Sequence, residues 1–292
     1  YAAARHIELI PEIEMPSHSE EVLAAYPELG CTGEPYKDSD FCVGNEAVFT
    51  FLETVLTEVM EMFPSEYIHI GGDEAGKEHW KTCPKCQQRM ADENISDVDG
   101  LQSYMIHRIG KFIASKGRKM IGWDEILQGG LAPGAVVMSW RGTDGGIEAM
   151  AAGHDVIMTP GRYCYLDHAQ DAPFKEPESI GGYLPLDSEY VCEPYEPKMP
   201  KDKLNHILGL QANLWSEYIP TDEHAEYMYW PRAFAIAETA WSEPHRKNQS
   251  DFRRRALIAI DLLRQRGYTR FSLDDTYGER KRAQDGLQHK PK

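Results

Sequence analysis

Short apolar runs along this chain alternate with longer stretches in which apolar residues recur at three- and four-residue steps. The short runs predict strands, and the longer stretches predict amphipathic helices. The predicted strands cover residues 6–13, 67–71, 119–123, 136–140, 155–159 and 207–214. The predicted helices cover residues 46–63, 101–115, 147–152, 225–241 and 251–266.

Strands that alternate with helices predict a parallel sheet. The residues at the strand ends suit chemistry: Glu12, Asp73, Trp123 with Asp124, Trp140, and Trp215 with Glu217. Functional groups after many strands indicate the (β/α)8 TIM-barrel type of α/β fold, whereas an open doubly wound sheet concentrates its site at one switch point. Six strands are two short of a closed barrel, so we expect a partial barrel over residues 1–272 and a polar tail over residues 273–292.

The charge and the apolar content of the chain argue against some kinds of partner. The formal net charge of −16 argues against nucleic acid or an anionic membrane surface as partner. No segment is long and apolar enough to span a bilayer. Tyr1 is not a natural start, so we expect that an upstream region is left out, and the compartment stays open.

The six cysteines allow several interpretations. Cys83 and Cys86 form a CPKC unit, but no second CxxC or HxxxH follows, so no metal site is expected. A polar loop between Cys31 and Cys42 could carry a disulfide in an oxidising compartment. We interpret Cys164 and Cys192 as buried thiols.

The stretch EYIHIGGDEAGKEHW holds the clearest candidate chemistry. Its apolar run ends in Gly71 and Gly72, which allow a sharp turn directly before Asp73 and Glu74. The residues from Ala75 to Trp80 are expected to be helical, which places both acids at a strand-to-helix turn. The alternative is that Asp73 is a helix N-cap beside a solvated Glu74.

Aromatic and acidic side chains at the predicted strand ends suggest a sugar ligand. Trp123, Trp140 and Trp215 offer flat faces for the C–H face of a pyranose, although a buried Trp is most often core. The carboxylates that could accept hydrogen bonds from sugar hydroxyls are Asp124, Asp167 and Glu217.

Six motifs in order make the chain, from about Arg5 to about Ser272, resemble the glycoside hydrolase family 20 β-N-acetylhexosaminidases. They are IPEIEMPSH, HIGGDE, GWDEIL, SWRG, YLD and QANLWSEY. The resemblance implies a glycosidase without cofactor that releases terminal β-linked GlcNAc or GalNAc from glycans. It also implies an exo-acting, retaining mechanism in which the substrate's own acetamido oxygen attacks the anomeric carbon, and a periplasmic or secreted location.

The resemblance also implies residue roles. Glu74 would be the general acid/base, with a pKa raised by burial among aromatic residues and by Asp73. Asp73 would hold the acetamido N–H, and Tyr165 would donate its hydroxyl to the acetamido oxygen. The remaining residues would bind the sugar: Trp123, Trp140 and Trp215 around the acetamido methyl, Asp167 and Glu217 at the outer hydroxyls, and His18 at the base of the site from the third strand.

The chain departs from the family pattern in places. No residue corresponds to the sugar-gripping Arg of the family's first strand, and the first two strands are missing. A further stacking Trp expected after Asp167 is replaced by Phe174, Tyr183 or Tyr190. We therefore expect these residues alone to form an open barrel of strands three to eight that self-associates and has little activity.

Two other interpretations remain. GGDEA resembles the GGDEF signature of diguanylate cyclases, which sits in a β-hairpin turn, whereas a helix is expected here. A non-catalytic, carbohydrate-binding remnant of a hexosaminidase is the more serious alternative. The intact acid pair disfavours it.

Overall fold

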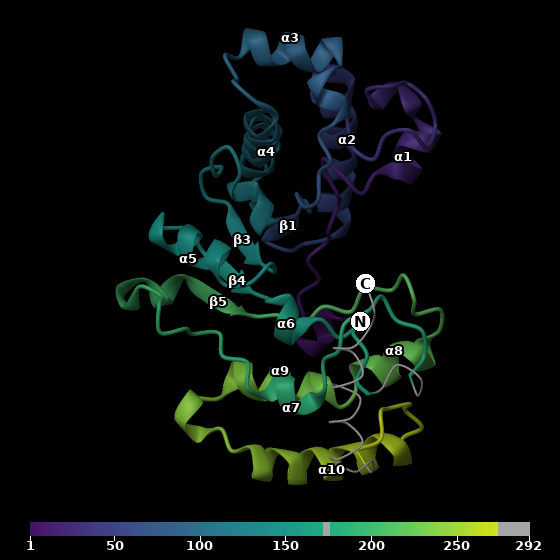
Figure 1. Ribbon diagram of the computed structural model, residues 1–292, viewed down its shortest axis with the longest axis vertical. Helices are drawn as coiled ribbons and strands as arrows, with labels where there is room; N and C mark the ends of the chain where they lie inside the picture. Colours follow the sequence, from purple (N-terminus) through teal and green to yellow (C-terminus); the bar gives the residue numbers. More distant parts are fainter. Residues whose placement is uncertain (172–175, 274–292) are drawn as a thin grey trace, which may run out of the picture. The chain divides into compact units, whose positions relative to one another are not determined.

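The computed structural model describes residues 1–171 and 176–273, and these form two compact units (Figure 1). The first unit comprises residues 1–139 and 144–156. The second comprises residues 140–143 and those from 157 onward. Phe174 and nearly all of the expected polar tail lie outside the described residues.

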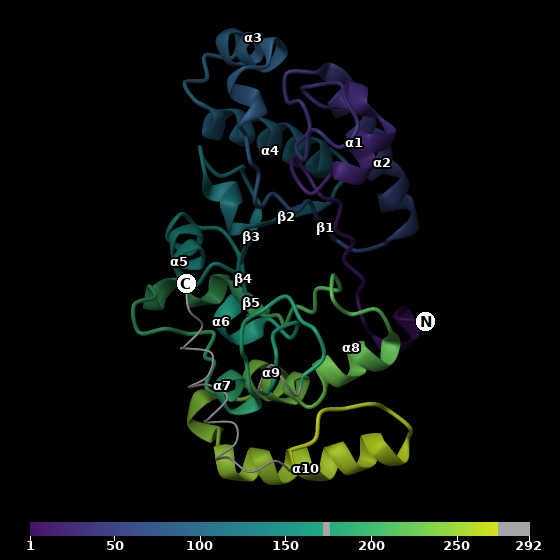
Figure 2. The same cartoon turned by 45° about the vertical axis from the view of Figure 1, so that its right-hand side comes forward.

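Five strands follow one another in chain order in the sheet. They are β1 (Tyr67–His69), β2 (Lys119–Trp123), β3 (Val136–Ser139), β4 (Val156–Met158) and β5 (Ile207–Leu210). Pairing is parallel from β1 to β2 and from β2 to β3 (Figure 2). Strand β4 begins in the first unit, where Asp155 O accepts from Val137 N at 3.0 Å, and ends in the second, where Met158 O accepts from Gln211 N at 2.9 Å.

The expectation of six strands was wrong for residues 6–13. This segment forms a single parallel bridge, between Glu12 and His69. Its outer apolar residues Ile7 and Leu9 are 55% and 54% exposed. Because backbone pairing with β1 starts only at Pro11, the earlier residues gain no ladder hydrogen bonds and form no strand.

Helices of the first unit follow the predicted apolar periodicity. They are α1 (Glu20–Ala25), α2 (Glu46–Met62), α3 (Pro84–Asp92), α4 (Val98–Ser115) and α5 (Asp144–Ala151). Asn45 caps α2 by accepting from Ala47 N, and Asp97 caps α4 by accepting from Gly100 N. The three predicted helices are confirmed to within a few residues, and α1 and α3 are additions.

Short 3-10 helices join these elements in both units. They are η1 (Ala3–Arg5), η2 (Pro27–Leu29), η3 (His79–Lys81), η4 (Asp124–Leu127), η5 (Lys201–His206) and η6 (Pro244–Arg246).

The second unit contains α6 (Gly161–Cys164), α7 (Leu186–Tyr190), α8 (Asp222–Tyr229), α9 (Arg232–Trp241) and α10 (Gln249–Gln265). The helix expected over residues 225–241 is divided between α8 and α9 at Trp230 and Pro231. Proline has no N–H for an intrahelical hydrogen bond, and its ring clashes with the preceding turn. The apolar periodicity therefore continues through Pro231, although the helix is interrupted there.

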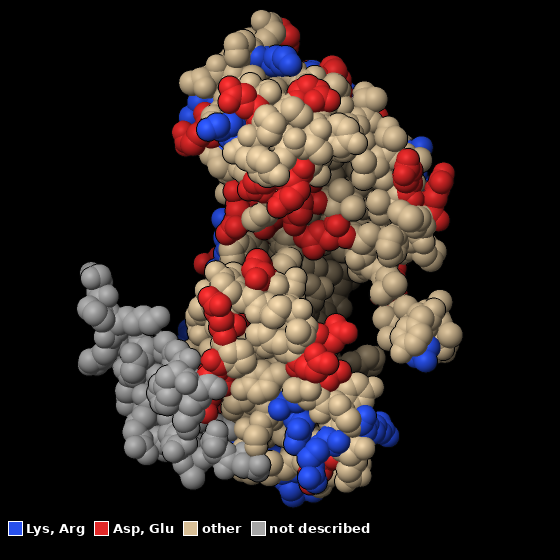
Figure 3. All heavy atoms as spheres, turned by 90° about the vertical axis from the view of Figure 1, so that its right-hand side faces the viewer, with Lys and Arg blue, Asp and Glu red and all other residues tan. Residues whose placement is uncertain are grey.

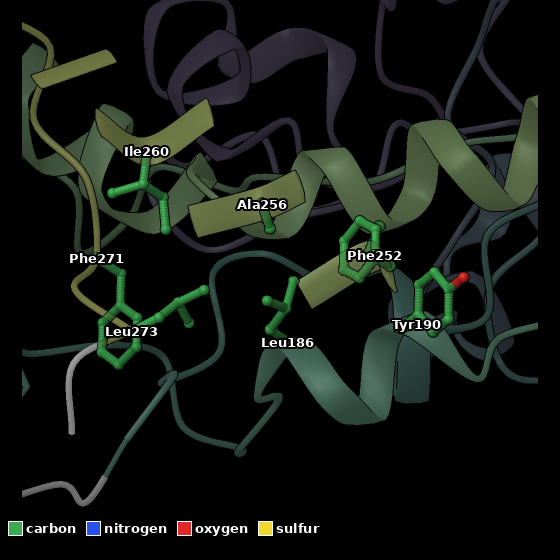
Figure 4. Close-up of a cluster of buried hydrophobic side chains, with 8 residues drawn as sticks. Leu186, Tyr190, Phe252, Ala256, Ile260, Phe271 and Leu273 are labelled. Atoms are coloured by element: carbon green, nitrogen blue, oxygen red, sulfur yellow. The ribbon is translucent and has the colours of Figure 1, made fainter. Parts of the chain in front are cut away.

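The core of the second unit forms where α7, α9 and α10 meet (Figure 4). The ring of Tyr190 on α7 stacks on Phe252 of α10, with centroids 4.3 Å apart and planes 13° apart. The hydroxyl of Tyr190 donates to Glu238 and accepts from the backbone N–H of Asn248. This aromatic pair therefore anchors α10 through both apolar and polar contacts.

None of the six cysteines, all within the described residues, forms a disulfide. The disulfide considered for Cys31 and Cys42 is therefore absent, because Cys31 lies in a larger group of thiols, with its Sγ 3.7 Å from that of Cys86. Cys164 and Cys192 are buried thiols, as expected.

Acidic side chains are exposed at many places on the face drawn in Figure 3. A compact group of basic side chains lies at the end of the view where α10 lies. Among the described residues, no helix has the length and apolar character needed to cross a membrane.

Replacing Phe252 by Ala should destabilise the second unit. The side chain is 3% exposed, and truncation of a buried Phe typically costs about 3–5 kcal/mol. Ile258→Ala on the same helix is the control, because Ile258 is 54% exposed. Urea unfolding followed by circular dichroism should separate the two variants, and equal stabilities would contradict the packing shown in Figure 4.

Candidate active site

The backbone turns sharply at Gly71 and Gly72, directly after β1. Both glycines have positive φ, +67° and +95°. A Cβ on Gly71 would lie 1.7 Å from Glu14 Oε2, and one on Gly72 would lie 2.6 Å from a methyl carbon of Ile126. The turn therefore requires glycine at both positions, as the sequence predicts.

Asp73 and Glu74 follow this turn, and His18 lies against both. His18 Nε2 is 3.4 Å from Asp73 Oδ2 and 3.4 Å from Glu74 Oε2. The side chain of Asp73 is 14% exposed, whereas that of Glu74 is 57% exposed. The structure thus brings these three predicted residues together, with one carboxyl buried and the other open.

The two acids do not stand at the start of a helix, as expected. Residues 71–77 are irregular, and the next helical element is η3. Glu74 and Lys77 have positive φ values of 49° and 61°, which are incompatible with a right-handed helix. Both the predicted helix from Ala75 to Trp80 and the N-cap interpretation of Asp73 are therefore wrong.

Glu74 was expected to be buried, but in the structure Asp73 is the buried carboxyl of the pair. Burial raises the pKa of Asp73, His18 lowers it, and the carboxylates of Glu12 and Glu74 raise it. Ser17 donates its hydroxyl to the backbone carbonyl of Asp73, which fixes the residue in the loop. Asp73 Oδ1 is buried and accepts no hydrogen bond from the described residues.

Glu14 is a buried carboxyl that the sequence did not single out. Burial raises the pKa of Glu14 far above its usual range, and the carboxyls of Asp73 and Glu12 raise it further. Glu14 therefore keeps its proton at neutral pH and can donate it in a hydrogen bond to a neighbouring carboxylate. The sequence held one signal for Glu14. In the extended segment PEIEM, side chains alternate, so Glu14 points to the same side of the chain as Glu12.

Glu12 is held by partners on two strands. Trp123 Nε1 donates to Glu12 Oε1 at 2.8 Å, and His69 Nδ1 lies 3.1 Å from the same oxygen. Burial raises the pKa of Glu12, but His69 and Trp123 outweigh it and lower the pKa overall. The rings of Trp123 and His69 pack with their centroids 4.9 Å apart. Trp123 is therefore a buried side chain whose N–H is already hydrogen-bonded to Glu12.

Asp124, considered as a sugar ligand, is buried. Its Oδ2 lies 3.5 Å from the hydroxyl of Ser139, which in turn accepts from Gly146 N. A Cβ on Gly145 would lie 2.7 Å from the Cβ of Asp124, so α5 covers this side chain. Asp124 therefore joins β3 to α5 and does not face a ligand.

In the second unit, the structure brings Trp140 and Tyr165 together. Their rings stack with centroids 6.1 Å apart and planes 27° apart. Tyr165 bridges to Asn213 in parallel pairing, and Gly161 N donates to Trp140 O at 2.8 Å. Both aromatic residues are partly exposed, which suits contact with a ligand.

Asp167 lies close to Trp215 and Glu217. Burial raises the pKa of Asp167 to about 6, although Arg232 lowers it. The charge of Glu217 raises this pKa, and the backbone N–H of Trp215 lowers it. Both oxygens of Asp167 are buried, and neither accepts a hydrogen bond of ordinary geometry from the described residues.

Arg232 is a second residue that the sequence did not identify. It is fully buried, and its guanidinium donates to the carbonyls of Leu166, His168, Leu184 and Met228. These bonds hold the chain on both sides of Asp167 in place. An Arg inside the apolar pattern of α9 was the only signal for such a buried cation.

Of the aromatic candidates for further sugar stacking, Tyr190 belongs to the core of the second unit and is 3% exposed. Tyr183 bridges to Ala169 and is partly exposed, so it remains a candidate. Phe174 is outside the described residues.

The ligand atoms of His18, Asp73 and Glu74 lie within 4.8 Å of one another, which is close enough for a metal ion. Exposed acidic groups often approach this closely without one, and an acid beside a carboxylate suits proton transfer equally well. The parallel pairing of β1 with β2 also differs from the hairpin in which a GGDEF motif sits, so the cyclase interpretation is wrong.

Comparison with known proteins agrees with this geometry. Residues 1–244 match the family model described as glycosyl hydrolase family 20, catalytic domain. A β-hexosaminidase from Porphyromonas gingivalis is 48% identical over 90% of this chain and 35% of its own length. One from Vibrio furnissii is 36% identical over 81% of this chain and 41% of its own length. The chain thus spans less than half of these two relatives.

Solved structures are similar as well. The β-N-acetylhexosaminidase of Bacteroides fragilis superimposes with a TM-score of 0.81 and 32% identity, covering 93% of this chain and 56% of that one. The family 20 exo-β-N-acetylglucosaminidase of Vibrio harveyi, in complex with N-acetylglucosamine, gives a TM-score of 0.84 and 28% identity, covering 94% and 45%. The expected partial barrel of the (β/α)8 type is thereby confirmed.

The raised pKa of Asp167 predicts a pH-dependent stability. The folded state holds this proton up to about pH 6, whereas an unfolded Asp releases it near pH 4, so burial destabilises the protein increasingly as pH rises through that window. Relative to Asp167→Asn, the unmodified protein should lose up to roughly 3 kcal/mol between pH 4 and 7. Urea unfolding at several pH values measures this, with the exposed Asp202→Asn as control. A pH-independent difference would contradict the burial of Asp167.

Proposed function

Because this chain belongs to glycosyl hydrolase family 20, we propose that it carries the catalytic machinery of an exo-acting β-N-acetylhexosaminidase. Its substrates would be glycans that end in β-linked GlcNAc or GalNAc. The names of the relatives, β-hexosaminidases in Porphyromonas gingivalis and Vibrio furnissii, support this substrate class. The reaction would be hydrolysis with retention, in which the substrate's acetamido group takes the place of an enzyme nucleophile.

The observation that carries the proposal is the placement of Asp73 and Glu74 on one side of His18. A conventional retaining pair flanks the scissile bond, with carboxyl groups about 5–5.5 Å apart across the sugar. Here both carboxylates approach the same nitrogen of His18 at 3.4 Å, which leaves no room for a sugar between them. A substrate-assisted reaction needs no carboxylate on the opposite face.

Glu74 is the proposed general acid. Its open position suits a group that must reach the oxygen between the terminal sugar and the rest of the glycan. Glu74 donates its proton to that oxygen as the bond to the anomeric carbon breaks and the acetamido oxygen attacks the same carbon. The resulting Glu74 carboxylate then takes a proton from the water that opens the cyclic intermediate.

Asp73 is the proposed partner of the acetamido N–H. As the acetamido oxygen attacks, positive charge develops on this group, and a carboxylate in a buried site stabilises it strongly. Asp73 Oδ1 is buried and free of a hydrogen bond from the described residues, so it can accept one from the ligand. The protonated Glu14 next to it can donate to the remaining acceptor sites of Asp73 and hold it in position.

The remaining site residues have proposed binding roles that follow the family resemblance. Tyr165, oriented by its stacking on Trp140, donates its hydroxyl to the acetamido oxygen. Asp167 and Glu217 bind the outer hydroxyls of the sugar, and His18 orients the two acids. The acetamido methyl group contacts the tryptophans Trp123, Trp140 and Trp215.

Changing Glu74 to Gln in the full-length protein should reduce turnover by about 10²–10⁴-fold on substrates with poor leaving groups. The loss should be smaller on activated aryl hexosaminides, because these leave without protonation. Glu78→Gln in the same segment is the control, since Glu78 is 75% exposed and pairs only with Lys81 among the described residues. Equal losses on both substrate types would show that Glu74 is not the acid.

A thiazoline analogue of GlcNAc should inhibit competitively, because it resembles the cyclic intermediate. Asp73→Asn should weaken this inhibition more than it weakens binding of an analogue without the acetamido group. Mass spectrometry of the protein quenched during turnover tests the same step. A sugar covalently attached to an Asp or Glu would refute the mechanism, and binding of the glycan without turnover would favour the carbohydrate-binding alternative.

A further inference from the structure

Four thiols meet in the first unit, away from the acids described above. They belong to Cys31, Cys42, Cys83 and Cys86, here termed the four-cysteine cluster. Cys31 follows η2, Cys42 lies just before the cap of α2, and Cys83 and Cys86 stand at the start of α3. Three separate segments therefore converge on one point.

The spacing of the sulfur atoms suits tetrahedral coordination of one ion. The Sγ atoms of Cys31 and Cys86 are 3.7 Å apart, as are those of Cys42 and Cys83 and those of Cys42 and Cys86. All four lie within 4.8 Å of one another. Zinc–sulfur bonds of about 2.3 Å in tetrahedral geometry place neighbouring sulfurs about 3.8 Å apart. Disulfide sulfurs are bonded at about 2.05 Å, so the observed distances are too long for that bond.

The surroundings are those of a built site. Cys42, Cys83 and Cys86 are buried, and Cys31 is partly buried. The loop after Cys42 packs so closely on the CPKC segment that a Cβ on Gly44 would lie 2.1 Å from the carbonyl carbon of Lys85. Cys83 and Cys86 are presented by the first turn of α3, in which Pro84 stands at the start. Soft thiolate ligands in a tetrahedral, closed arrangement are those that structural zinc prefers.

We propose that the four-cysteine cluster binds one structural zinc ion. A single ion coordinated by four thiolates accounts for the convergence of three segments that share no regular secondary structure. A cluster of several irons would hold its cysteine ligands farther apart than a single ion does, so the distances favour one metal atom. This proposal does not depend on the proposed hydrolase activity.

The zinc would brace the segment that carries Asp73 and Glu74. The chain between Cys31 and Cys42 contains Asp40, whose carboxylate accepts from Lys77 N at 2.8 Å and from Gly76 N at 3.4 Å. The same stretch contains Asp38, whose Oδ1 lies 2.6 Å from His79 Nδ1.

The residues on either side of His18 are hydrogen-bonded to the same stretch between Cys31 and Cys42. Phe41 N donates to Pro16 O at 2.8 Å, and Ser19 N donates to Ser39 O at 3.2 Å. The four-cysteine cluster thus closes a loop that contacts the chain just after the candidate acids and on both sides of His18, and its ion would act on them through position alone.

Metal analysis of the purified full-length protein tests the proposal. Plasma mass spectrometry should find about one zinc per chain, held after dialysis and released by a thiol-modifying mercurial. Cobalt replacing the zinc should give the visible absorption of tetrahedral thiolate coordination. Less than a stoichiometric amount of zinc, or peptides cross-linked between two of these cysteines without reduction, would refute the proposal. Iron in place of zinc would refute the choice of metal.

Variants locate the ion. Cys42→Ser and Cys86→Ser should each lose the zinc and lower the melting temperature, because a structural ion contributes to folding stability. Cys192→Ser, a buried thiol of the second unit, should keep one zinc per chain. Full zinc in the cluster variants, or its loss in Cys192→Ser, would place the ion elsewhere. Activity is a separate readout: zinc without turnover would count against the proposed hydrolase and not against the metal site.

Discussion

The candidate site depends on one steric constraint, the glycine turn at the end of β1. The carboxyl of Glu14 occupies the space that a side chain on Gly71 would need. The carbonyl of Gly71 accepts from Trp123 N at 2.8 Å, which joins the turn to the end of β2. Any larger residue at position 71 would displace Glu14 or the backbone, and both support Asp73. The turn therefore positions two strand ends and the candidate acids at once.

Three carboxyls packed at this turn could not all be charged at low cost, since like charges in a buried site repel strongly. The structure separates their protonation. Glu12 remains ionised because Trp123 donates a hydrogen bond to it and His69 lies beside it, and both lower its pKa. Glu14 becomes neutral because burial and its two neighbouring carboxyls raise its pKa. A neutral Glu14 changes from a repelling charge into a hydrogen-bond donor. Asp73 can then serve as a carboxylate although it is surrounded by acids.

The sequence predicted much of this arrangement. Periodicity identified α2, α4 and α10, because their apolar faces repeat over several turns, and apolar runs identified the five strands. The predictions of a strand over residues 6–13 and of a helix after Glu74 were wrong, because tertiary contacts and positive φ values override the local preference there. Motif order brought out His18, Asp73 and Glu74. Glu14 and Arg232 were missed because a buried charge looks like a solvated one in a sequence until its surroundings are known.

The cysteines show the limit of spacing arguments. The CPKC unit alone gave too little support for a metal, since zinc ligands usually come in two closely spaced pairs. In this chain the other two thiols, Cys31 and Cys42, are separated by ten residues, 32–41, and belong to a loop with no regular structure. The packing of Gly44 against Lys85 brings that loop onto the start of α3. A tertiary contact can therefore supply the second pair of metal ligands. The number of residues between the two ligands is then the length of the loop that the metal closes, and it does not match a short motif.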